Sequence, residues 1–273
     1  MDFIEILKAI LFGIVEGITE WLPISSTGHM ISLDDLVKLN VSGAFREMFL
    51  VVIQLGAILA VVVLYFKKLW PFSTKEKFFI KKDTFGMWFK ILAACIPAAI
   101  VGVFFDDKIN ELFYNYQTVA AMLIIFGVLF IVIENYNKGR KPVMNSIAEI
   151  TWKAAIGVGL FQLIAAVFPG TSRSGATILG GILLGMSRTT AAEFTFFLAV
   201  PVMAGASLLK LVKFGLAFSA SEAVILIVGM VVAFVVSIIV SKFLLNYIRR
   251  NDFKAFGWYR IVLGVLVILF FSL

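Results

Sequence analysis

Two glutamates and a histidine stand close together in the stretch EGITEWLPISSTGHM, residues 16–30. Glu16 and Glu20 are four residues apart, so both carboxylates fall on one face of a single helix. Paired carboxylates are hard oxygen ligands of the kind that Mg²⁺ and Ca²⁺ prefer. The spacing therefore predicts that Glu16 and Glu20 hold a divalent cation, and the simpler alternative is that they only solvate the mouth of a hairpin.

The residues after Pro23 carry hydroxyl groups at a predicted helix start. Proline ends the incoming helix, and Ser25, Ser26 and Thr27 can cap the outgoing one. A helix start also offers free N–H groups and the positive end of a dipole, which together bind anions. His29 lies three residues after Ser26 and can share its face of the helix. We expect His29 to act as a nucleophile's base or as a proton donor to a leaving group.

A second polar break interrupts an apolar region at FPGTSRSGAT, residues 168–177. Thr171, Ser172 and Ser174 repeat the hydroxyl pattern of the first break, and Arg173 adds a planar guanidinium that matches phosphate oxygens. Anion donors, a metal ion, a nucleophile and a proton carrier are the parts that phosphoryl transfer requires. The two breaks together therefore predict phosphate chemistry.

The counts of two residue types exclude several rival enzymes. His29 is the only histidine, so the chain cannot supply one histidine as nucleophile and another as leaving-group acid. Cys95 is the only cysteine and lies in an apolar span without a basic loop, which argues against a cysteine phosphatase. It also excludes an internal disulfide. Serine, histidine and metal-activated water remain open as nucleophiles.

The composition identifies an integral membrane protein. Of the 273 residues, 61% are hydrophobic and only 15% are charged, against about half and a quarter in soluble domains. The formal charge of +7 is spread over short loops between apolar runs, so it indicates membrane topology and no nucleic-acid partner. We expect no cleavable signal, because Asp2 and Glu5 stand where a basic region is required.

Six segments are apolar enough to cross a bilayer, which takes about 20 residues. They are residues 48–66, 86–105, 118–133, 194–209, 223–241 and 257–273. Two further apolar regions contain the breaks described above. Non-helical backbone at membrane depth is tolerated only where protein buries it or where it lines a cavity. We therefore predict that both regions are helix hairpins that enter the membrane and return on the same side.

An internal repeat relates the two breaks. A shift of 146 positions lays residues 13–27 on residues 159–173 without a gap, so that Pro23 meets Pro169 and Ser26 meets Ser172. Each half then holds one hairpin and three spans, and this odd number of crossings inverts the second half. The predicted fold is an all-α polytopic membrane protein with an inverted repeat. It is one integral domain, 1–273, with a first repeat at 1–137 (hairpin about 3–38) and a second at 150–273 (hairpin about 150–186).

The basic residues are distributed unevenly under this topology. Seventeen of the 24 lysines and arginines, Arg260 among them, fall on one side, six fall on the other, and Arg173 lies at a hairpin tip. The positive-inside rule assigns the first side to the cytoplasm and places both termini outside.

At these residues the sequence closely resembles the bacterial undecaprenyl pyrophosphate phosphatase family, also called bacitracin resistance proteins. EGITEWLPISSTGH resembles the glutamate-rich motif of that family, and PGTSRSGAT resembles its second signature, PGxSRSxxT. The likeness extends over essentially the whole chain.

The resemblance implies a hydrolase of the bacterial inner membrane that converts undecaprenyl diphosphate to undecaprenyl phosphate, the carrier for peptidoglycan synthesis. It implies Ser26 as nucleophile, His29 as acid and base or as an alternative nucleophile, and Arg173 as the diphosphate clamp. It also implies that Glu16 and Glu20 hold the divalent cation, Mg²⁺ or Ca²⁺, or order the site, and that the site faces the extracytoplasmic side. The remaining substrate contacts are Ser25, Thr27, Gly170, Thr171, Ser172, Ser174 and Thr177.

The main alternative is an inverted-repeat transporter or a lipid-phosphate flippase. Paired broken helices and buried carboxylates occur in carriers too. A carrier needs anion donors but no nucleophile with a proton partner, so the serine, histidine and arginine together favour the enzyme. A homodimer is left open.

Overall fold

The protein is described here by a computed structural model that places residues 3–74, 79–215 and 218–272. Within these ranges the regular elements are helices, and the isolated bridges of Phe72 with Ile80 and of Met144 with Met186 form no strand. The helices are α1 Phe3–Thr19, α2 Ser26–Leu36, α3 Gly43–Val52, α4 Gln54–Leu64, α5 Phe66–Leu69, α6 Lys82–Phe113, α7 Tyr116–Tyr136, η1 Ile147–Glu149, α8 Trp152–Val167, α9 Arg173–Leu183, α10 Arg188–Phe214, α11 Ala220–Ile248 and α12 Lys254–Ser272.

Six helical segments of the described chain are long and apolar enough to cross a membrane. They are Gly43–Leu64, Lys82–Phe105, Tyr116–Tyr136, Arg188–Phe214, Ala220–Ile248 and Lys254–Ser272. Each overlaps one predicted span, so the prediction of an all-α polytopic membrane protein is confirmed. The first segment is formed by α3 and α4, which are separated by a single turn residue, Ile53.

Polar residues cap the N-termini of α3, α7, α8, α10 and α11, where the sequence changes from a loop to an apolar run. The side-chain oxygens of five residues accept a hydrogen bond from the backbone N–H three positions later, which satisfies an otherwise free donor of the first turn. These caps are Ser42, Asn115, Thr151, Ser187 and Ser219.

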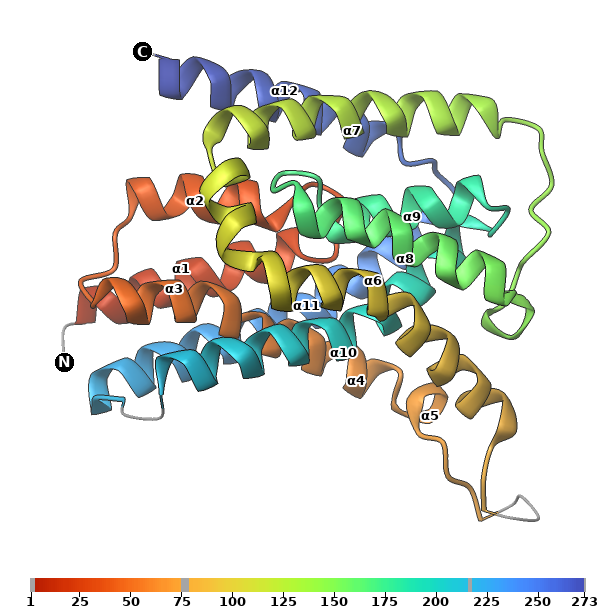
Figure 1. Ribbon diagram of the computed structural model, residues 1–273, viewed down its shortest axis with the longest axis horizontal. Coiled ribbons are helices and arrows are strands. Elements are labelled where there is room, and N and C mark those ends of the chain that lie inside the picture. Colours follow the sequence, from red (N-terminus) through yellow and green to blue (C-terminus); the bar gives the residue numbers. More distant parts are fainter. Residues whose placement is uncertain (1–2, 75–78, 216–217, 273) are drawn as a thin grey trace.

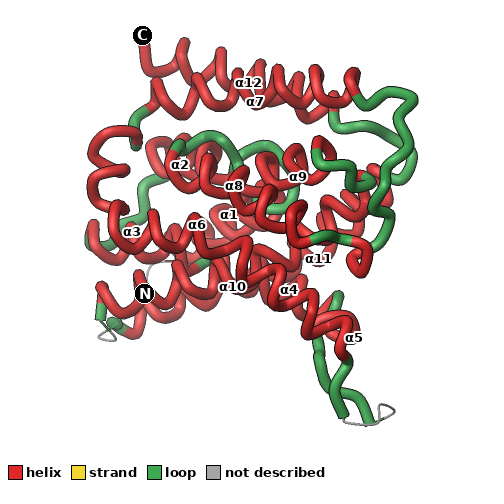
Figure 2. The backbone as a smooth tube through the Cα atoms, turned by 45° about the vertical axis from the view of Figure 1, so that its right-hand side comes forward, coloured by secondary structure: helices red, strands yellow, loops and turns green. Residues whose placement is uncertain are grey.

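The two broken regions form helix hairpins that run in opposite directions. In Figure 1, α1 runs from the N-terminal side to the right and α2 returns to the left, whereas α8 runs to the left and α9 returns to the right. The turns between the helices lie inside the bundle, and both ends of the described chain lie on the same side of the molecule (Figures 1 and 2).

Each hairpin packs against a helix from the other half of the chain. Helix α1 lies along α11, and α8 lies along α6. Glycines allow these close approaches: a Cβ at Gly13 would lie 2.6 Å from the Gly229 carbonyl oxygen, and one at Gly159 would lie 2.5 Å from that of Ala94. These are the glycines that the shift of 146 positions superimposes. The hairpins are therefore held by equivalent contacts with exchanged partners.

One basic residue lies in a different place from the one predicted. Arg260 belongs to the apolar helix α12 and is completely buried, where the sequence analysis counted it with the basic loops. The remaining sixteen residues of that group still outnumber the six on the other side, so the charge bias does not depend on Arg260.

Candidate active site

Serine caps define both breaks. Ser25 precedes α2 and Ser172 precedes α9, and both have positive φ angles, 73° and 69°. Their hydroxyl oxygens accept from the backbone N–H of Gly28 and Gly175. Positive φ is strained for residues other than glycine, and such strain concentrates at functional sites. The caps are 147 residues apart, so the gapless shift of 146, which paired Ser25 with Thr171, is wrong at the break by one residue.

The first residues of the two helices meet at one carboxylate. The Ser26 hydroxyl donates to Glu20 Oε2 at 2.8 Å, and Arg173 Nη2 donates to Glu20 Oε1 at 2.8 Å. The side chains of Arg173 and Glu20 are only 14% and 6% exposed. Ser26 and Arg173 occupy equivalent positions directly after the caps, although they are far apart in the sequence. The structure thus brings together three of the predicted catalytic residues.

His29 lies one turn into α2, and its two ring nitrogens have partners other than Glu20 and Ser26 Oγ. Its Nδ1 lies 2.8 Å from the Ser25 carbonyl oxygen, and its Nε2 lies 2.7 Å from the Tyr259 hydroxyl. A carbonyl can only accept, so Nδ1 carries a proton, and in neutral imidazole Nε2 accepts from Tyr259. The acceptor of the Ser26 hydroxyl in the structure is therefore Glu20 and not His29, and the role of His29 as base or proton donor stays a prediction.

The remaining hydroxyls predicted to bind substrate divide into two groups. Ser174 donates to the Glu20 carbonyl oxygen at 3.0 Å, and Thr177 donates to the Arg173 carbonyl oxygen and accepts from Thr195. Both hydroxyls are therefore engaged within the protein, where they bind the backbone of Glu20 and Arg173. Thr27 is half-buried and has no hydrogen-bond partner in the described structure, so its hydroxyl is available to a ligand.

Gly170 and Thr171 contribute backbone to the second break. Gly170 has a φ of +89°, and a Cβ there would lie 2.4 Å from the Val119 carbonyl oxygen, so only glycine fits. The Thr171 side chain is fully buried, and its hydroxyl has no partner. Neither residue forms a hydrogen bond with Glu20 in the described structure, and both instead shape the turn before α9.

Glu16 completes the acidic pair that was predicted to hold a metal ion. It is fully buried, and both of its carboxylate oxygens lack a hydrogen-bond partner. Within the described residues, no group of three or more His, Cys, Asp or Glu side chains forms a site by itself. Mg²⁺ characteristically takes one or two carboxylates together with substrate phosphates. The residues present fit that arrangement.

Two residues of α12 that were not predicted as site residues contact this site. Tyr259 contacts His29, with the rings stacked at a centroid distance of 5.8 Å. Arg260 contacts both breaks through backbone carbonyl groups. Arg260 falls within the predicted apolar span 257–273, and this was the available signal, because charges within the bilayer are costly and usually functional.

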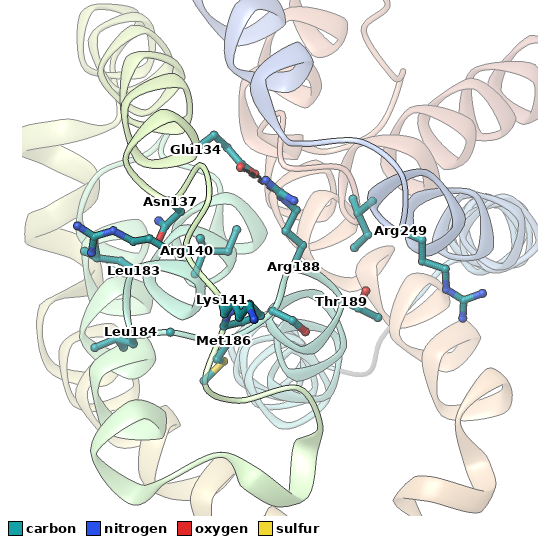
Figure 3. A pocket seen from close by; sticks show the side chains of 15 residues that line it. Glu134, Asn137, Arg140, Lys141, Leu183, Leu184, Met186, Arg188, Thr189 and Arg249 are labelled. Carbon is teal, nitrogen blue, oxygen red and sulfur yellow. Dashed lines mark hydrogen bonds and ion pairs between the residues drawn. The ribbon is translucent and has the colours of Figure 1, made fainter.

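A cavity of about 480 Å³ lies elsewhere, at the opposite end of α9. Figure 3 shows Arg188 pointing toward Glu134 in this cavity, while Arg140 and Arg249 point outward and away from each other. Arg188 donates to both oxygens of the fully buried Glu134. None of the predicted site residues lines this cavity, so it is separate from the site around Glu20.

Comparison with known proteins gives full-length matches. Residues 9–266 match the family described as bacitracin resistance protein BacA. The chain is 67% identical to the undecaprenyl-diphosphatase of Desulfitobacterium hafniense over 100% of its length and 98% of the relative's. It is 66% identical to undecaprenyl-diphosphatase 1 of Clostridium acetobutylicum and 63% identical to the undecaprenyl-diphosphatase of Acetivibrio thermocellus, covering 98–99% of each chain.

Proposed function

The chain belongs to the bacitracin resistance protein BacA family, and we propose that it hydrolyses undecaprenyl diphosphate at the site around Glu20. It is a membrane undecaprenyl-diphosphatase that releases undecaprenyl phosphate and inorganic phosphate. This reaction recycles the lipid carrier for peptidoglycan synthesis and confers bacitracin resistance. We place the reaction at this site because Ser26 and Arg173, which come from two separate breaks, both donate a hydrogen bond to the Glu20 carboxylate.

In the first step Ser26 Oγ attacks the terminal phosphorus. Glu20 Oε2 already accepts the hydroxyl hydrogen at 2.8 Å and takes the proton as the new P–O bond forms. The bond from phosphorus to the bridging oxygen breaks, and undecaprenyl phosphate leaves. Arg173 and the free N–H groups at the start of α2 and α9 stabilise the charge on the phosphoryl oxygens.

In the second step water attacks the phosphoryl group held by Ser26. The Ser26–phosphorus bond breaks, and Ser26 recovers its proton from Glu20. One water proton stays on the departing phosphate, and the other passes to His29 Nε2 and on to solvent. The Tyr259 hydroxyl, 2.7 Å from Nε2, orients the imidazole for this role, and its oxygen can accept from Nε2–H once the proton is bound. His29 as the nucleophile is the competing assignment.

Glu16 and Glu20 are the residues that would hold the divalent cation, Mg²⁺ or Ca²⁺. When bound, the cation neutralises phosphate oxygens as charge develops on them. The unpartnered oxygens of Glu16 support this assignment, since a buried carboxylate without any partner is costly.

We also propose that the fold is an inverted repeat with two re-entrant hairpins. The opposed directions of the hairpins (Figure 1), their exchanged helix partners and their matching serine caps support it. The first hairpin then enters from the side of the termini. With the basic loops in the cytoplasm, as the positive-inside rule requires, the site opens to the extracytoplasmic face of the inner membrane.

The test is phosphate release from undecaprenyl diphosphate by the purified full-length protein in detergent. We expect release in Mg²⁺, loss with chelator and recovery on adding Mg²⁺ back. Ser26→Ala and Arg173→Ala should abolish release while keeping the wild-type elution volume, and Ser42→Ala, which removes a helix cap remote from Glu20, is the matched control. A folded, metal-supplied wild type without release would overturn the proposal.

A further inference from the structure

Arg260 joins the two breaks from the middle of α12. Its Nη1 donates to the Pro23 carbonyl oxygen at 3.2 Å. Its Nη2 lies 2.9 Å from the carbonyl oxygen of Gly170, 2.8 Å from that of Thr171 and 3.3 Å from that of Met122. Pro23 belongs to the first break, and Gly170 and Thr171 belong to the second. One guanidinium therefore ties together two loops that are about 147 positions apart in sequence.

The surroundings of Arg260 are unusual for a buried cation. The side chain is 0% exposed, and no carboxylate of the described residues lies within ion-pair distance of it. Buried charges are normally paired with an opposite charge. Here four carbonyl oxygens take that place, and Nε has no partner at all. Burying this charge costs free energy, and an apolar side chain could fill the same space without that cost. What an apolar side chain could not supply is the set of hydrogen bonds to the two breaks.

The same guanidinium also packs against the first turn of α9. A Cβ at Gly175 would lie 3.0 Å from Arg260 Nη1, and the N–H of Gly175 is the donor to the Ser172 cap. The neighbouring residue, Tyr259, binds His29. Helix α12 thus contacts the start of both site helices, through one residue each.

We infer that Arg260 is a positioning residue for the phosphatase reaction: it fixes the two breaks relative to each other so that Ser26 and Arg173 act on the same phosphoryl group. The inference rests on the proposed function. Ser26 Oγ and Arg173 Nη2 converge on Glu20 only while the helix starts keep their relative position, and an error of about 1 Å can cost about a hundredfold in rate. Lysine cannot replace this fork, because its single ammonium cannot reach carbonyls on two loops from two separate nitrogens.

The test compares Arg260→Lys and Arg260→Gln with wild type in purified full-length protein. Lysine keeps the positive charge, and glutamine keeps an N–H donor on a shorter side chain. Arg188→Lys is the matched control, since Arg188 also joins helices through a buried partner, Glu134, but at the opposite end of α9. The measurements are kcat and KM for undecaprenyl diphosphate in Mg²⁺, the melting temperature, and amide hydrogen exchange in peptides covering the two breaks.

For both Arg260 variants we expect kcat to fall about ten- to a hundredfold while KM changes little. We expect exchange to rise about tenfold or more at both breaks together, since charge-assisted hydrogen bonds that limit local opening are lost. Arg188→Lys should lower the melting temperature and leave kcat and exchange at the breaks as in wild type.

Three results would overturn the inference. One is wild-type kcat in Arg260→Lys. Another is reduced kcat with unchanged exchange at the breaks, which would make Arg260 a direct electrostatic contributor. The third is failure of both variants to fold, which would assign Arg260 to the bundle as a whole. If wild type itself released no phosphate, the proposed function would fail, while the exchange data would still report whether Arg260 clamps the breaks.

Discussion

Replacing Glu20 by glutamine tests whether this carboxylate is the base of the reaction. Glu20→Gln keeps the size of the side chain but removes the charge that accepts from both Ser26 and Arg173. The amide offers one oxygen to two donors, so its NH₂ group must face either the hydroxyl or the guanidinium. General base catalysis contributes about 10²–10⁴-fold, and we expect kcat to fall by a factor in that range.

The same substitution also affects stability, because it breaks a buried ion pair. The side chains of Arg173 and Glu20 are 14% and 6% exposed, and removing one partner of such a pair costs about 3–5 kcal/mol. The Thr195 carbonyl oxygen, 3.2 Å from Arg173 Nη1, retains part of the guanidinium's bonding, so we expect the lower end of that range. Thermal unfolding in detergent, read by intrinsic fluorescence, measures the change relative to wild type.

The control for this prediction is Glu47→Gln. Glu47 pairs with Lys210 but its side chain is 69% exposed, so neither kcat nor the melting temperature should change appreciably, because exposed ion pairs contribute only about 0–1 kcal/mol. His29→Gln is measured in parallel. If Glu20→Gln kept kcat within threefold of wild type while His29→Gln lost a hundredfold, the base would be His29 and the assignment of Glu20 would be refuted.

Three further changes have defined outcomes. Tyr259→Phe removes the hydroxyl that contacts His29 Nε2 at 2.7 Å, and we expect kcat to fall about fivefold, the value of about 1 kcal/mol for one hydrogen bond; an unchanged kcat would show that His29 needs no orientation. Gly170→Ala places a methyl 2.4 Å from the Val119 carbonyl oxygen at positive φ, so we expect a loss of stability of about 3 kcal/mol or more in thermal unfolding, whereas Gly205→Ala, which meets nothing within 4 Å, should be neutral. Glu16→Gln removes one of the two cation ligands, and titration of activity with Mg²⁺ should need about tenfold or more cation; an unchanged titration curve would remove Glu16 from the metal site.

The sequence was sufficient for the architecture because each span is a long apolar run. Residues 118–133, for example, have no competing interpretation, and they lie inside α7, Tyr116–Tyr136. The two helix breaks were also predictable, since Pro23 and Pro169 interrupt apolar segments that cannot expose backbone to lipid. The position of the serine caps, Ser25 and Ser172, was not predictable to the residue, because it depends on the conformation of each turn.

The sequence pointed to residues that the structure brings together, such as Ser26, Glu20 and Arg173, but not to how they pair. Ser26 and His29 are three residues apart on a helix, so the sequence suggested that they act on each other. In the structure each of them has a different partner. Glu20, six residues earlier, accepts the hydrogen bond of the Ser26 hydroxyl, and Tyr259, 230 positions away, contacts His29. Arg260 was counted with the loops although its place within an apolar span was a signal; its partners could not be predicted, because they are carbonyl groups, which leave no pattern in the sequence.

The most direct measurement of the central claim is to find where the phosphoryl group goes in a single turnover. Purified protein is mixed with undecaprenyl diphosphate labelled in its terminal phosphate, quenched within milliseconds, digested and mapped for the labelled peptide. The account predicts a transient label on Ser26, formed at the rate of the first step and absent from Ser26→Ala. A label on His29, or phosphate release with no labelled protein at any time, would contradict it.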